Sequence, residues 1–207
     1  AAEADMRRAQ ELTLAEKVRA DREMATAQAV ASFLQDDLLA QASPNAQASA
    51  AGASNANLTV RTLLERSSNR LATKFPDQPA VRASLEHTIA VAYLDLGLYT
   101  QAREHAQQAA DIRTRLLGAQ DRSTHASLDR LAMAYRGEGK LADAERIWTS
   151  LLAYQRNALG ESHPDTLQSM HSLAALYRSQ GKSEKAIPLY EKALELRRRV
   201  LDRKSVV

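Results

Sequence analysis

The sequence predicts an all-helical protein in which helical hairpins stack on one another behind one long N-terminal helix. The main observation is a repeat. The segments TIAVAYLDLG, RLAMAYRGEG and SLAALYRSQG end at Gly97, Gly139 and Gly181, at a constant spacing of 42 residues. Repetition at a fixed period of this size is typical of stacked repeat arrays. The second observation is composition: of 207 residues only 7 are Gly and 5 are Pro, which favours helices, and no strand pattern is present.

Each repeat contains two helical patterns separated by a break at its glycine, which predicts a helix-turn-helix hairpin. Small alanines on both sides of the break let the two helices approach closely, Gly ends the first helix, and a tyrosine fills the space between neighbouring hairpins. The recurring columns are Ala90, Ala132 and Ala174, then Tyr93, Tyr135 and Tyr177, and then Ala102, Ala144 and Ala186.

This order of Leu, Ala, Tyr, Gly and Ala resembles the tetratricopeptide repeat, in the longer variety found in kinesin light chains. The segment LGESHPDTL, residues 159–167, resembles the signature between repeats of that variety. The resemblance implies an all-α tetratricopeptide repeat α-solenoid, a right-handed superhelix of helix hairpins with a long N-terminal helix. The expected elements are an extra helix at 59–75 and repeats at about 79–118, 119–160 and 161–202.

Several residues predict where these helices begin. Ser162 and Asp165 have the spacing of a capping box, and Pro164 falls in the first turn, where its missing N–H costs nothing. The second repeat lacks this proline, so its helix start is less well defined. Thr59 is the expected N-cap of the extra helix, with Val60, Leu63, Leu64 and Leu71 on its buried side. Pro188 lies close enough to the start of the last helix for that helix to continue through it.

Two regions precede the repeats within the chain. Residues 1–40 predict a stalk and docking helix, solvated in its first half and apolar on one face later. Residues 41–57, rich in Ala, Ser and Asn, predict a flexible low-complexity linker. The repeat array then occupies 58–207. The apolar docking residues are Val30, Phe33, Leu34, Leu38 and Leu39.

The segments FLQDDLLAQASP, LTVRTLL and QPAVR, at 33–44, 58–64 and 78–82, carry a second resemblance. Together they resemble the region that joins a membrane helix to tetratricopeptide repeats in bacterial transmembrane serine/threonine kinases and in membrane-anchored winged-helix regulators. The resemblance implies a periplasmic sensor domain whose membrane helix lies upstream of Ala1, with a cytoplasmic location as the alternative. The chain itself has no kinase motif.

A search for chemical motifs found none of HExxH, GxSxG, GxGxxG or a Walker loop. The five histidines have no ligand spacing within one helix, and the absence of Cys excludes disulfides and thiolate chemistry. We therefore expect no catalytic site, no cofactor and no metal. The net charge is only +3, and the arginines at 197–199 complement a helix C-terminus, so we expect no nucleic-acid partner.

The first helix of each hairpin should line a concave groove that binds an extended protein or peptide. Arg136 and Arg178 are in register and suit an acidic peptide or a C-terminal carboxylate, the alternative being ion pairs with acidic residues of neighbouring helices. Trp148 and Tyr190 share a column and are expected in the core. The groove positions that the family resemblance implies are Ser84, His87, Val91, Leu94, Asp129, Arg130, Met133, Arg136, Gln168, His171, Ser172, Ala175 and Arg178.

His87, Asp129 and His171 occupy one repeat column and are expected as exposed polar side chains in the groove. A pH-sensitive contact between them is the alternative, because imidazole titrates near neutrality.

The function that follows is a non-catalytic module that binds protein or peptide ligands and signals through the N-terminal helix. The alternative is an assembly module, in which a second copy covers the apolar side of the last helix, at 183–201, to form a homodimer.

Overall fold

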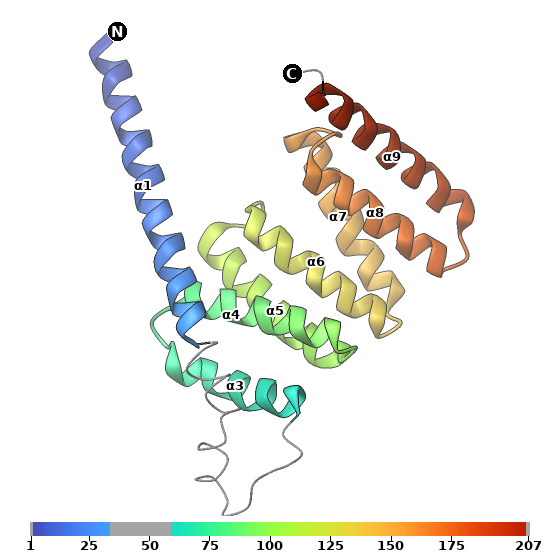
Figure 1. Cartoon of the computed structure of the whole chain (residues 1–207), viewed down its shortest axis with the longest axis horizontal. Coiled ribbons are helices and arrows are strands. Elements are labelled where there is room, and N and C mark those ends of the chain that lie inside the picture. The colour runs from blue at the N-terminus through green and yellow to red at the C-terminus, as the bar shows by residue number, and fades with distance from the viewer. Residues whose placement is uncertain (1, 34–58, 206–207) are drawn as a thin grey trace, which may run out of the picture. The chain divides into compact units, whose positions relative to one another are not determined.

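A computed structural model shows an all-helical chain, as the composition and periodicity predict. It describes residues 2–33 and 59–205, and within them it contains no strand. The predicted linker, together with Leu34, Leu38 and Leu39, lies outside the described residues. The α-helices in the described part are α1 Ala2–Ser32, α3 Val60–Lys74, α4 Pro79–Asp95, α5 Tyr99–Leu117, α6 Arg122–Gly137, α7 Leu141–Leu159, α8 Pro164–Ser179 and α9 Ser183–Ser205 (Figure 1).

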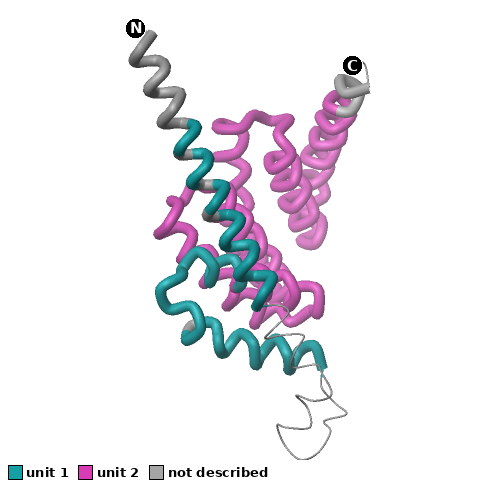
Figure 2. Tube along the Cα trace, turned by 60° about the vertical axis from the view of Figure 1, so that its left-hand side comes forward, with its two compact units in different colours: residues 1–85 teal, residues 86–207 magenta. Residues whose placement is uncertain are grey.

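The chain divides into two compact units, Ala1–Leu85 and Glu86–Val207, and the division falls within α4 (Figure 2). In the first unit most described side chains of α1 are exposed, including Leu14 and Val18. Phe33, directly after α1, is buried, and its ring lies edge-on to that of Phe75 at a centroid distance of 6.1 Å. Of the predicted docking residues that the structure describes, Phe33 is therefore buried and Val30 is half-buried.

Helix α3 begins where the sequence predicts. The hydroxyl of Thr59 accepts a hydrogen bond from the backbone N–H of Thr62 at 3.3 Å, which makes Thr59 the N-cap. Leu63, Leu64 and Leu71 are buried as expected. The prediction for Val60 is wrong, because its side chain at the first helical position is 57% exposed.

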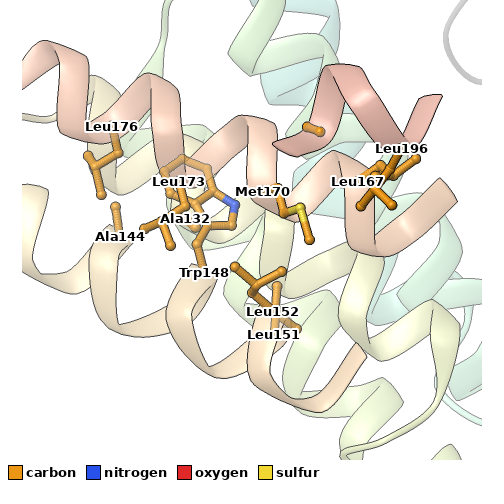
Figure 3. Close-up of a cluster of buried hydrophobic side chains, with 11 residues drawn as sticks. Ala132, Ala144, Trp148, Leu151, Leu152, Leu167, Met170, Leu173, Leu176 and Leu196 are labelled. Atoms are coloured by element: carbon orange, nitrogen blue, oxygen red, sulfur yellow. The ribbon is translucent and has the colours of Figure 1, made fainter. Parts of the chain in front are cut away.

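In the second unit α5 to α9 follow one another, each packed on the next in the chain (Figure 1). The main core lies between α6, α7, α8 and α9. Trp148 of α7 is fully buried at its centre, surrounded by side chains such as Ala132, Met170 and Leu173 (Figure 3). Trp148 is thus a core residue, as expected.

The hairpin turns depend on a glycine in the left-handed region. Gly139 has φ 77°, a conformation that costs a residue without a Cβ little. The next N–H, that of Lys140, then donates to the carbonyl of Tyr135 at 2.9 Å and closes the end of α6. The alanines of the repeating columns are all buried, so the helices approach closely there: Ala90, Ala102, Ala132, Ala144, Ala174 and Ala186.

The connections between repeats share a second device. The hydroxyl of Thr124 donates to the carbonyl of Gly118 at 2.9 Å, and the hydroxyl of Thr166 donates to that of Gly160 at 2.8 Å. Both threonines are fully buried. Because the two pairs are 42 residues apart, each helix start is fastened to the preceding connection in the same way.

The prediction of a capping box at Ser162 is wrong. His163 is the N-cap of α8, and its Nδ1 accepts a hydrogen bond from the N–H of Asp165 at 3.2 Å. Pro164 occupies the first helical position, so the cap must be the residue directly before it. In α6, where the proline is missing, the carboxylate of Asp121 accepts from the N–H of Ser123 at 2.7 Å.

Candidate functional site

The candidate groove residues lie on α4, α6 and α8, the first helices of the three hairpins, and differ widely in exposure. Ser84 belongs to the first compact unit and the others to the second. Asp129 and Ser172 are buried. Gln168, His171 and Arg178 are exposed. The half-buried members are Ser84, His87, Val91, Leu94, Arg130, Met133, Arg136 and Ala175.

Asp129 does not face a ligand, which corrects the sequence prediction of an exposed groove residue. Its Oδ1 accepts a 2.8 Å hydrogen bond from the indole N–H of Trp148, and its Oδ2 lies 3.2 Å from Nη2 of Arg130. Arg130 also donates to the sulfur of Met133 at 3.2 Å. Side chains predicted to bind a ligand therefore hold the core tryptophan and one another.

His87 is half-buried rather than exposed, so that prediction is also wrong. Its Nδ1 lies 3.5 Å from the hydroxyl of Ser127 on α6. The pKa of His87 is lowered to about 4, mainly by burial and in addition by the positive charges of Arg113 and Arg130. The imidazole is therefore neutral near pH 7.

His171, in the same repeat column, has a different environment. Its side chain is exposed, and its ring lies edge-on to that of Tyr190 at a centroid distance of 5.3 Å. With Asp129 buried between the two histidine positions, this column does not form one row of exposed polar side chains.

Arg113 on α5 belongs to this surface, although the sequence analysis did not identify it. Its Nη1 donates to the hydroxyl of Ser127 at 2.8 Å and to the carbonyl of Ser123 at 2.9 Å. Burial lowers its pKa below the ordinary value of an arginine, but the guanidinium remains charged. The repeat pattern contains a signal that could have identified Arg113. Its column lies on the packed side of α5, α7 and α9, where apolar residues are expected. The residues found there are instead Arg113, Gln155 and Arg197.

Arg136 and Arg178 are the candidate arginines that lack an ion-pair partner in the described chain. The guanidinium carbon of Arg136 lies 5.8 Å from the centre of the Trp148 ring, a favourable cation–π arrangement. Arg178, one repeat further on, is exposed. In the described part of the chain, neither has a carboxylate within ion-pair distance. The alternative that they pair with acidic residues of neighbouring helices is therefore not what the structure shows.

The candidate residues thus carry surplus positive charge. They include Arg130, Arg136 and Arg178, while Asp129 is the one acidic residue among them and already contacts Arg130 and Trp148. Such a surface attracts anionic ligands. Within residues 2–33 and 59–205, no group of three or more His, Asp or Glu side chains can hold a metal ion.

A cavity of about 330 Å³ lies elsewhere in the second unit, among α5, α6 and α7. It contains none of the candidate residues. Its lining is formed by Gln107, Leu128, Leu131, Tyr135, Arg146, Ile147, Ser150 and Leu151. None of the described helices is long and apolar enough to cross a bilayer.

Comparison with known proteins agrees with this architecture. The family model described as tetratricopeptide repeat matches residues 81–147 and 123–199, more than half of the chain. No curated protein sequence matches.

Solved structures with the same arrangement include two of a kinesin light chain with nearly identical TPR-like repeats from Podosopora anserina, both 28% identical in sequence. Their TM-scores are 0.61 and 0.59; the alignments cover 69% and 68% of this chain and 68% and 67% of theirs. BtubC (BKLC) from P. vanneervenii, 20% identical, has a TM-score of 0.58 over 86% of this chain and 74% of its own. At that identity the likeness shows the fold alone.

Proposed function

This chain belongs to the tetratricopeptide repeat family, and from that premise we propose that it is a non-catalytic module that binds an acidic peptide or a C-terminal carboxylate. The family generally mediates protein–protein interaction and is not tied to any catalytic activity. The proposed binding surface lies within the second compact unit and is formed by the part of α4 from Glu86 onward together with α6 and α8.

The observation that carries the proposal is the pair Arg136 and Arg178. The two residues are in register on α6 and α8, one repeat apart, and in the described chain neither is neutralised by a carboxylate. A guanidinium presents two parallel N–H groups to a carboxylate, which makes a short, charge-assisted contact. An extended peptide with two acidic groups would therefore satisfy both arginines at once.

The test is selection from a library of random peptides displayed with free C-termini, using the whole chain as bait. We expect the selected peptides to be rich in Asp and Glu, and their affinity to fall by about 10- to 100-fold in the double variant Arg136→Ala, Arg178→Ala. The matched control is Arg115→Ala, Arg146→Ala, which removes the same charge from α5 and α7. Equal binding by wild type and the first double variant would remove the assignment.

Because Arg136 lies over Trp148, its loss also affects packing, so a single variant is needed beside the double one. Arg178→Glu changes only an exposed side chain and should weaken the same peptides without lowering the free energy of unfolding. Unchanged affinity in this variant would contradict the proposal independently.

We further propose that this module is the periplasmic sensor region of a bacterial receptor-type protein, either a transmembrane serine/threonine kinase or a membrane-anchored winged-helix regulator. The support is the sequence resemblance at 33–44, 58–64 and 78–82, together with the mostly exposed described side chains of α1, which suit a stalk. Protease digestion of spheroplasts that make the parent protein tests the location. We expect the repeats to be cut before lysis; protection until lysis would favour the cytoplasmic alternative.

A further inference from the structure

Helix α9 presents an apolar stripe that its own unit does not cover. Ile187 is 53% exposed and Leu194 is 51% exposed, and the spacing of seven residues places them on one face. The positions in register with Leu194 are Leu152 and Ala110, which are only 4% and 2% exposed. This column is therefore one that the stacking of hairpins normally buries.

Ile187 also departs from the repeat pattern. The residues in register with it are Arg103 and Glu145, and each makes a polar contact with the turn of the next hairpin. Arg103 Nε lies 3.0 Å from Glu138 Oε1, and Glu145 Oε2 accepts from Gln180 Nε2 at 3.2 Å. In α9 an apolar side chain replaces these polar groups, so an apolar contact surface takes the place of the polar contact.

Two charged residues flank Leu194. Glu191 and Arg198 lie three residues before and four residues after Leu194, both exposed, and in the described chain neither has an ion-pair partner. Their neighbours are already used, since Glu195 pairs with Arg199, and Lys192 pairs with Glu161. Glu191 and Arg198 therefore remain free to pair across an interface.

The charges of Glu191 and Arg198 on one copy of α9 are complementary to those on a second, antiparallel copy. When two copies of α9 lie antiparallel about a two-fold axis near Leu194, Glu191 of one copy faces Arg198 of the other, and the same pair forms again on the other side of the axis. Leu194 of each copy then lies between the two pairs, while Ile187, seven residues before Leu194, lies outside them and extends the contact beyond the charges. A closed two-fold contact uses the same face of both chains, which a face of mixed charge around an apolar centre permits.

We propose that α9 is the interface of a homodimer, with Leu194 at its centre, reciprocal Glu191–Arg198 ion pairs on either side of it and Ile187 beyond those pairs. The occupant of the apolar stripe is a second copy of this chain. This proposal does not depend on the peptide-binding function, because none of the residues involved lies on α4, α6 or α8.

The test is sedimentation equilibrium of the whole chain over a range of concentrations. We expect a monomer–dimer equilibrium for wild type and a dissociation constant at least about 10-fold weaker for Leu194→Glu. Leu194 is half exposed, so this change leaves the fold intact, as circular dichroism will verify. The matched control is Leu116→Glu on α5, which is 46% exposed in wild type and should leave the dimer unchanged.

Charge reversal identifies the partner as a second copy. Glu191→Arg or Arg198→Glu alone should weaken the dimer, because each places like charges opposite each other, and the double variant should restore wild-type affinity. Three results would overturn the proposal: a monomeric wild type up to about 100 µM, a double variant no tighter than the singles, or a dimer that survives Leu194→Glu but is lost in Val18→Glu on α1. The first result would leave the stripe to a further hairpin of a longer protein.

Discussion

Trp148 donates its indole N–H to the Oδ1 of Asp129 across 2.8 Å, and both side chains are buried between α6 and α7. The same carboxylate lies 3.2 Å from Arg130. This arrangement lets the largest side chain of the core keep its one hydrogen bond while its ring packs among Leu and Met side chains. Asp129, although it belongs to the predicted groove positions, therefore holds the core tryptophan in place.

Asp129→Ala should lower the free energy of unfolding by roughly 2–4 kcal/mol, because the indole N–H then lies buried without an acceptor. Asp129→Asn keeps an acceptor oxygen and should cost less than half as much. Urea unfolding of both variants, followed by tryptophan fluorescence, measures the difference. Equal losses for the two variants would contradict the role of the hydrogen bond.

The first hairpin contains a buried, hydrogen-bonded Glu–His pair where the later hairpins have apolar pairs. Glu86 Oε2 lies 2.6 Å from His105 Nδ1, and these side chains are 4% and 13% exposed. The residues in register are first Leu128 with Ile147 and then Met170 with Leu189. His105→Ile alone should cost roughly 3 kcal/mol, because it leaves the Glu86 carboxylate buried without this partner.

The double variant Glu86→Leu, His105→Ile should recover most of that loss and unfold within about 1 kcal/mol of wild type, or at higher stability. The coupling energy from a double-mutant cycle in urea measures the contribution of the pair. Losses that simply add would show that the two residues do not act together.

His87 should make stability depend on pH below neutrality. Its pKa is 6.5 in the unfolded chain and about 4 in the folded one, so between these values the unfolded state binds the additional proton. The stability is therefore complete above about pH 6.5 and falls as the pH drops toward 4. Because His87 is still partly exposed, we expect a loss of roughly 1–2 kcal/mol after allowing for solvent screening.

The pH test compares His87→Gln with wild type, because His125, whose pKa is also lowered by burial, contributes to both curves. The variant should lose less stability than wild type between pH 6.5 and 4. His171→Gln, which changes an exposed ring, serves as the control. Parallel curves for wild type and His87→Gln would show that the histidine is not responsible.

Replacing the connecting threonines should weaken the contacts between repeats. Thr166→Val keeps the shape of the side chain but removes the 2.8 Å hydrogen bond to the carbonyl of Gly160. We expect a loss of about 1–2 kcal/mol in thermal or urea unfolding. Thr124→Val should cost a similar amount, because its 2.9 Å bond to Gly118 has the same geometry. A neutral effect at both sites would show that water replaces these bonds.

The hairpins, their turns at Gly139 and its equivalents, and the close alanine contacts followed from the sequence, because these features depend on residues near one another in the chain. The N-cap at Thr59 is equally local. A repeating pattern of small, aromatic and glycine residues allows few backbone conformations, so residue order alone was enough to predict them.

The partners of polar side chains could not be predicted in this way. Asp129 faces Trp148, which is nineteen positions away, and His87 is enclosed by Arg113 and Ser127 from the next two helices. A repeat column shows which face of a helix a residue occupies. The packing of the other helices decides whether that residue contacts solvent, a charged side chain or the core. The sequence therefore determined the helices and their apolar faces. The tertiary structure alone decided which charges remain free to bind, because burial and pairing arise only when distant segments come together.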